Sequence, residues 1–142
     1  MAARASSTVF LPGLRLAALV AISIALACTA SSEPLELTSG ATVEVAGIVK
    51  GDELEVKQSG GSARLRMLGI HAFAAVLDDP QLDALELRAR DWLEGNLSGQ
   101  TVRIVLGAVP KDGSGRFLGY VEKTGTDINR QLVAEGRAVV YS

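Results

Sequence analysis

The sequence predicts a mainly β domain of the α+β class, with five short strands and two helices. Several segments alternate apolar and polar residues with a period of two, one longer segment repeats its apolar residues at helical spacing, and glycine-rich turns separate them. The order is three strands, a helix, two strands and a short helix. This order favours a five-stranded OB-fold barrel, because a lipocalin-like barrel needs more strands and a parallel α/β sheet needs more helices.

The first three strands are expected between residues 42 and 70. "TVEVAGIV", which starts at Thr42, alternates and then stays apolar, with Gly47 as a predicted bulge. "LEVK" (54–57) follows the turn "KGDE", and "ARLRMLGI" (63–70) follows the flexible "QSGGS". The third segment carries apolar residues on both faces, which suits a strand of a small closed barrel.

A long helix is expected next. Asp79 can cap its N-terminus, and Pro80 can occupy its first turn. The helix should end near "EGN" (94–96). One apolar stripe, which we assign to core packing, comprises Leu82, Leu85, Ala89, Trp92, Leu93 and Leu97.

The last part of the domain should contain two strands and a short helix. "TVRIVL" (101–106) and "RFLGYVEK" (116–123) are the predicted strands, joined by the turn "GAVPKDGSG". Asp127 should cap the helix "INRQLVAEG", which Gly136 ends, and "RAVVY" (137–141) can add a strand fragment.

The N-terminal residues 1–27 have the order of a secretory signal peptide. Arg4 and Arg15 precede the apolar run "LAALVAISIALA", and no acidic residue is present. The run of 12 is shorter than the roughly 20 apolar residues of a spanning helix. We therefore expect export, with an uncleaved N-terminal anchor as the alternative.

Cys28 directly follows this run, and "IALAC" resembles the lipobox of bacterial lipoproteins. The resemblance implies lipidation of Cys28 and a membrane-anchored lipoprotein, and the alternative is a secreted or periplasmic protein cleaved nearby. Residues 28–41 are predicted to be a tether and residues 42–142 the domain. No second cysteine exists to form an intramolecular disulfide.

The net charge gives no sign of a non-specific nucleic-acid binder. The whole chain has a formal charge of −2, and removal of Arg4 and Arg15 would leave 12 basic against 16 acidic residues, or −4. Tight non-specific binding usually needs a basic protein, although a local basic patch can override the global charge.

We expect the protein to be a monomer.

Five segments in order resemble the staphylococcal nuclease (thermonuclease-like) family. They are "VKGDELEV", "RLRMLGIHA", "LSGQTVRI", "KDGSGRFLGYV" and "DINRQLVAEGRAVV", and the resemblance covers roughly residues 43–141. It implies an OB-fold barrel and calcium-dependent hydrolysis of DNA and RNA. Such chemistry needs a hard cation held by carboxylates, a general base, and arginines that bind phosphate.

The resemblance places two functional arginines, Arg66 and Arg116, at the family's positions. A guanidinium offers a donor fork that fits two phosphate oxygens. The two are therefore candidate phosphate-binding and catalytic residues that share one anion pocket. The alternative for each arginine is a guanidinium exposed to solvent at a strand edge, or a salt bridge to Asp52 or Asp112.

The residues at the family's metal site and general-base position match the family pattern less well than the arginines do. Asp52 matches a family metal ligand, but His71 stands where the family has the second metal aspartate, in "IHAFA". Calcium prefers oxygen, so Asp52 with His71 would suit a transition metal better; a structural or exposed histidine is the alternative. The family's glutamate base falls on Ala74, which cannot accept a proton, and Glu53, Asp78 or Asp79 would have to replace it.

Three functions remain open. The first is an exported barrel with an incomplete catalytic set, which binds a phosphate-containing ligand or nucleic acid with weak or no hydrolysis. The second is an active, metal-dependent nuclease outside the cytoplasm. The third is a structural or interaction module of the cell envelope whose arginines are held in salt bridges.

Overall fold

The computed structural model describes residues 34–73 and 78–141. The signal peptide predicted at 1–27, the candidate lipidation residue Cys28 and the base position Ala74 lie outside these residues. The helices and strands are β1 (Thr42–Lys50), β2 (Glu53–Gln58), β3 (Gly61–Met67), β4 (Ile70–His71), α1 (Pro80–Leu97), β5 (Thr101–Lys111), β6 (Phe117–Lys123), β7 (Thr126–Asp127), α2 (Ile128–Ala134) and β8 (Val139–Val140). No helix among them is long and apolar enough to span a membrane.

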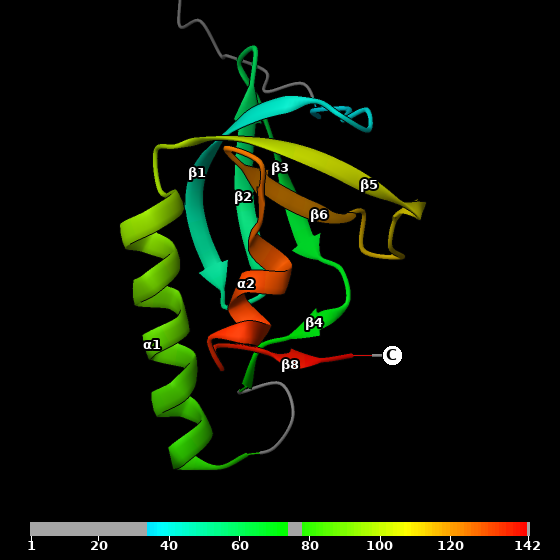
Figure 1. Cartoon of the computed structure of the whole chain (residues 1–142). Helices are drawn as coiled ribbons and strands as arrows, with labels where there is room; N and C mark the ends of the chain where they lie inside the picture. The colour runs from blue at the N-terminus through cyan, green and yellow to red at the C-terminus, as the bar shows by residue number, and fades with distance from the viewer. Residues whose placement is uncertain (1–33, 74–77, 142) are drawn as a thin grey trace, which may run out of the picture. The chain divides into compact units, whose positions relative to one another are not determined.

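Five strands close into a barrel, as the sequence predicts. The sheet order is β3-β2-β1-β5-β6-β7, and an additional parallel pairing joins β3 to β6 and closes the sheet. Leu65 pairs with Phe117 and Met67 with Gly119 along this closure. A closed sheet leaves no long open edge. Figure 1 shows the strands wrapped around a common interior, with α1 beside β1. The OB-fold class is therefore confirmed.

The core fills the barrel and the space under both helices. Its largest fully buried side chains include Leu54 and Leu65 from the strands, Leu93 and Leu97 from α1, and Leu132 from α2. The side chain of Asp79 accepts a hydrogen bond from the Gln81 N–H and caps α1, as predicted. The helix presents the predicted apolar face, on which Glu86 is also buried.

Two elements differ from the sequence prediction. The third strand ends at Met67, and a turn at Leu68–Gly69 separates it from β4, with Gly69 at a positive φ of 74°. A positive φ is favourable for glycine, which has no Cβ. Strand β5 continues five residues beyond Leu106 and includes Pro110, where the β5–β6 pairing is irregular between Leu106 and Lys111. Proline is tolerated at such an irregularity because no ladder hydrogen bond is needed there.

The segment before β1 packs on the barrel. Leu37 is buried in the core cluster, and Leu35 packs against it. The Ser39 hydroxyl accepts a hydrogen bond from the Leu106 N–H, and the Gly40 N–H donates to the Ile104 carbonyl. The predicted tether thus includes residues that contribute to the domain's packing.

Candidate anion site

Two acidic residues, Asp52 in the turn between β1 and β2 and Glu53 at the start of β2, lie where α1 contacts this turn. The Gly51 N–H donates a 2.6 Å hydrogen bond to Glu86 Oε1. A Cβ at position 51 would lie only 2.9 Å from Glu86 Oε2, so a larger residue there would force the Glu86 carboxylate to shift. Asp52 and Glu53 are buried, with 5% and 3% of their surface exposed. The turn is therefore fixed by tertiary contacts rather than by its own strands alone.

Asp52 lies beside Arg66 and His71, which brings the predicted metal pair together. Asp52 Oδ2 accepts a hydrogen bond from the Ala72 N–H at 3.1 Å. The same oxygen lies 3.7 Å from Arg66 Nη2 and 3.6 Å from His71 Nδ1. Arg66 Nη2 is 2.6 Å from His71 Nδ1, and because a guanidinium only donates, the imidazole accepts there. Arg66 thus lies beside the two predicted ligands and contacts both of them.

This arrangement does not fit a hard cation. Calcium takes six to eight oxygen ligands, whereas Asp52 Oδ2 already faces a backbone donor and a guanidinium. Within residues 34–73 and 78–141, no group of three His, Cys, Asp or Glu side chains is placed to hold a metal ion. We derive no metal-dependent step from these residues.

Strand β8 brings Tyr141 to the same place. His71 and Val139 are register partners between β4 and β8. The rings of His71 and Tyr141 meet edge to face, with centroids 4.3 Å apart. Sequence reasoning placed a strand fragment at 137–141 but did not connect Tyr141 with the site, because a two-residue pairing leaves no periodic signal.

Arg116 makes a separate cluster, with two carboxylates. Its Nε donates a 2.7 Å hydrogen bond to Asp112 Oδ2, and its Nη1 donates a 2.9 Å hydrogen bond to Glu53 Oε2. The hydrogen bond that Arg116 donates to Asp112 has the largest effect, followed by the one to Glu53, and both raise the pKa of Arg116 above its ordinary value. The salt bridges considered from the sequence, Arg66 with Asp52 and Arg116 with Asp112, are both present.

A basic hollow lies next to Arg116. It is lined by Lys50, Glu53, Arg64, Ser114, Gly115 and Arg116. Three positive side chains against one negative side chain give the lining a formal charge of +2. Arg66 does not line it, and Arg64 stands beside Arg116 instead. This hollow thus combines Arg116 with Arg64 and Lys50, and it does not include Arg66, which was expected to share a pocket with Arg116.

The other two basic residues of the hollow, Arg64 and Lys50, retain hydrogen-bond donors for a ligand. The Arg64 side chain is 60% exposed and uses Nη1 for a 3.1 Å bond to Glu53 Oε1. Lys50, the last residue of β1, is exposed and makes no ion pair with any residue that the structure describes. Guanidinium and ammonium groups that converge on one hollow are the usual partners of a phosphate.

Asp112 organises the turn that presents Arg116. Its carboxylate accepts hydrogen bonds from the Ser114 N–H, the Arg116 N–H and Arg116 Nε at 2.9, 3.0 and 2.7 Å. Burial acts to raise the pKa of Asp112, but the hydrogen bonds from Arg116 and Ser114 outweigh it, and the pKa lies below its ordinary value of 3.8. The folded protein therefore favours the ionised carboxylate.

Replacement of Asp112 by asparagine should destabilise the domain at neutral pH and matter less in acid. A carboxylate whose pKa is lowered on folding stabilises the protein above its unfolded pKa, and the stabilisation is lost as the pH falls through the folded pKa. Urea denaturation of the unmodified protein and of Asp112→Asn, at neutral pH and below pH 3.8, measures the difference in their free energies of unfolding. A difference in free energy of unfolding that grows in acid would contradict the prediction.

Two of the three candidates for a replacement base are engaged in other contacts. Glu53 is bonded to two arginines, and Asp79 caps α1. Asp78 is exposed. The buried acid that sequence reasoning missed is Glu86, whose position on the apolar face of α1 was the available signal.

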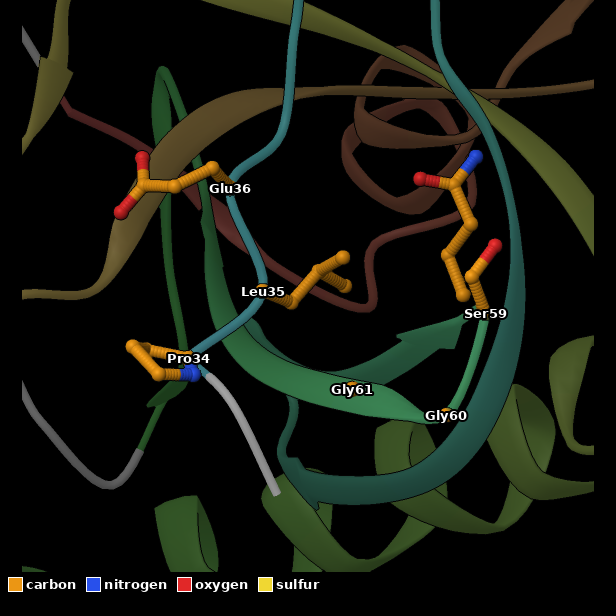
Figure 2. Close-up of a pocket in the computed structure, with 7 residues that line it drawn as sticks. Pro34, Leu35, Glu36, Ser59, Gly60 and Gly61 are labelled. Atoms are coloured by element: carbon orange, nitrogen blue, oxygen red, sulfur yellow. The ribbon is translucent and has the colours of Figure 1, made fainter. Parts of the chain in front are cut away.

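A second hollow lies away from these residues, between the segment before β1 and the β2–β3 turn. It is lined by Pro34, Leu35, Glu36, Gln58, Ser59, Gly60 and Gly61. Figure 2 shows the Leu35 side chain directed into it and Glu36 directed away. Glu36 accepts a hydrogen bond from Lys111, and Gln58 donates to the Thr42 carbonyl. The lining contributes no positive side chain, so we do not assign the anion site here.

Comparison with known proteins gives one family match. The family model described as staphylococcal nuclease homologue matches residues 64–142, more than half of the chain. The match includes Arg64, Arg66, His71 and Arg116 and begins after the acidic turn at Asp52 and Glu53. A search of curated proteins finds no match.

Proposed function

Because the chain belongs to the staphylococcal nuclease homologue family, we propose that it binds a phosphate-containing ligand or nucleic acid, with weak or no hydrolysis of phosphodiester bonds. The observation that carries this proposal is the basic hollow lined by Lys50, Arg64 and Arg116. One phosphate group can receive donors from several such side chains at once. The acidic balance of the rest of the chain makes this hollow a local site rather than part of a general basic surface.

Several departures support binding without fast turnover. The sequence has Ala74 where the family resemblance implies a glutamate base. Asp52 is surrounded by Arg66, His71 and the Ala72 N–H rather than by further oxygen ligands. Loss of a general base typically lowers a rate by 10²–10⁴-fold. Binding through the hollow does not depend on either missing group.

We further propose that the domain acts outside the cytoplasm. The support is the order of basic, apolar and small residues in 1–27, followed by Cys28. Lipidation of Cys28 would anchor the domain to a membrane. The proposed form is a monomeric lipoprotein or a secreted protein, with a phosphorylated ligand or nucleic acid as its partner.

The proposal predicts that a nucleoside bisphosphate binds the full chain and shifts the amide resonances of Ser114 and Gly115. Both residues line the hollow, so a bound anion changes their environment directly. The unphosphorylated nucleoside is the matched control and should leave these resonances unchanged. Single-stranded DNA and RNA, each with calcium, manganese or zinc, should show no fast cleavage under the same conditions.

Absence of any shift with the bisphosphate would overturn the binding proposal. Rapid cleavage with one of the metals, abolished by both Arg66→Ala and Arg116→Ala, would show an active nuclease instead. The carboxylate partners of Arg66 and Arg116 specifically favour a second candidate, a structural or interaction module. That candidate predicts no response to phosphate at all.

A further inference from the structure

The carboxylate of Glu53 lies where the arginines of the hollow would meet a ligand. One oxygen, Oε1, accepts a 3.1 Å bond from Arg64 Nη1, and the other, Oε2, accepts a 2.9 Å bond from Arg116 Nη1. Only 3% of the residue is exposed, although it is part of the lining. A single carboxylate thus joins the two guanidinium groups that give the hollow its positive charge.

These contacts have the chemistry of phosphate binding. A carboxylate and a phosphate both offer two oxygens to guanidinium donors, with short charge-assisted hydrogen bonds. A phosphate that uses Nη1 of Arg64 or Arg116 must therefore displace Glu53 or share the donor with it. The negative charge of Glu53 also repels an anion that enters the hollow.

Glu53 is not required to orient Arg116. Asp112 already holds the guanidinium through Nε at 2.7 Å and also bonds the main chain of the same turn. Arg64 emerges from the middle of β3, which its ladder with β2 fixes. The guanidinium of Arg116 and the backbone of Arg64 thus have support that is independent of Glu53.

We propose that Glu53 is an internal competitor for the anion, which limits the affinity of the hollow for phosphate. This inference rests on the proposed function, because it concerns the same hollow. It identifies an autoinhibitory contact built from residues 63 positions apart in the sequence, Glu53 and Arg116. The hollow then binds little phosphate at low concentration, and it binds only an anion that competes with Glu53 for both guanidinium groups.

The test is the variant Glu53→Gln, which preserves the size of the side chain and removes its charge. The matched control is Glu55→Gln. Glu55 lies two residues along the same strand, is exposed, and is the register partner of Arg64. Both variants change the net charge equally, but only the first removes a carboxylate that is bonded to Arg116.

Inorganic phosphate is titrated into the full chain and both variants at one ionic strength, with the Ser114 and Gly115 amide shifts as the readout. Glu53→Gln should bind about ten-fold more tightly than the unmodified protein, the change expected for one charge-assisted hydrogen bond. Glu55→Gln should bind nearly as the unmodified protein does. Thermal unfolding of each protein checks that the fold is retained.

The outcomes separate this inference from the proposed function. If the unmodified protein binds phosphate and Glu53→Gln binds equally or more weakly, Glu53 is not a competitor, and only this inference is overturned. Equal tightening in both variants would attribute the effect to net charge and would also overturn it. If neither the unmodified protein nor any variant binds, the proposed function is overturned together with the competitor role.

Discussion

Replacement of Asn129 by alanine should lower the free energy of unfolding by about 3 kcal/mol. Asn129, in α2, is 2% exposed. Its Oδ1 accepts a 3.0 Å bond from the Val121 N–H, and its Nδ2 donates 2.8 and 3.4 Å bonds to the Leu68 and Gly119 carbonyls. Alanine would leave the Val121 N–H and the Leu68 carbonyl without these partners, at a cost of roughly 1–3 kcal/mol for each fully buried group, whereas the Gly119 carbonyl still accepts from the Leu68 N–H.

The effect extends to the barrel closure. Gly119 pairs with Met67 across the β3–β6 junction, and Leu68 begins the turn that leads to His71. Asn129 therefore links α2 to β6 and to the turn that follows β3. Its loss should weaken the closure before it affects the distant β1–β2 ladder.

Urea denaturation of the purified variant measures this change, and Asn96→Ala is the matched control. Asn96 is an exposed residue near the end of α1, and its Nδ2 donates to the Trp92 carbonyl. Its replacement should change stability by less than about 0.5 kcal/mol, as is usual for surface positions. Equal losses in the two variants would show that the buried network of Asn129 has no special role.

The elements that the sequence predicts correctly have signals that are local. The cap formed by Asp79 with Pro80 and the cap formed by Asp127 are set within a few residues of each helix start. The strands β1, β2 and β3 alternate, because each buries one set of side chains in the barrel. Local periodicity and capping are therefore sufficient to order these elements along the chain.

The errors occur where a distant partner decides the conformation. Gly107 and Pro110 indicated a turn, but the strand continues through them and pairs with β6 again at Lys111. The third strand ends at Met67: the Leu68 N–H still donates to the Gly119 carbonyl, but the Leu68 carbonyl accepts a hydrogen bond from the Asn129 side chain in α2. Neither partner is visible in the residues around the element itself.

The candidate site divides in the same way. The residue types at Asp52, Arg66, His71 and Arg116 follow from the sequence, and the structure brings the first three together. The composition of the basic hollow does not follow, because Lys50, Arg64 and Arg116 come from β1, β3 and the β5–β6 turn. The role of Glu53 needs its contact with Arg116, 63 residues away, and no periodic pattern encodes such a pair.

Replacement of Arg116 by alanine should reduce phosphate affinity by more than ten-fold and stability by about 2 kcal/mol. The variant removes one wall of the hollow and leaves the buried Glu53 with Arg64 as its remaining ionic partner. Removal of one member of a buried ion pair typically costs 3–5 kcal/mol. Retention of Arg64 and the partial exposure of Arg116, 29% for its side chain, argue for a smaller value.

Arg116→Lys distinguishes the charge of the residue from the shape of its guanidinium. Lysine keeps the positive charge but cannot present separate fixed donors to Asp112 and Glu53. It should recover only part of the lost affinity, as measured by phosphate titration with the Ser114 and Gly115 amide shifts. Full recovery would show that a point charge at this position is sufficient.

Arg103→Ala is the control for both measurements. Arg103 also pairs with a carboxylate, at 2.9 Å from Glu122, but its side chain is 58% exposed on β5 and does not line the hollow. An exposed pair contributes about 0–1 kcal/mol, so this variant should retain stability and phosphate binding. If folded Arg116→Ala binds phosphate as tightly as Arg103→Ala does, the anion does not bind at this hollow. The positive charge gathered there would then serve only to neutralise Glu53 and Asp112.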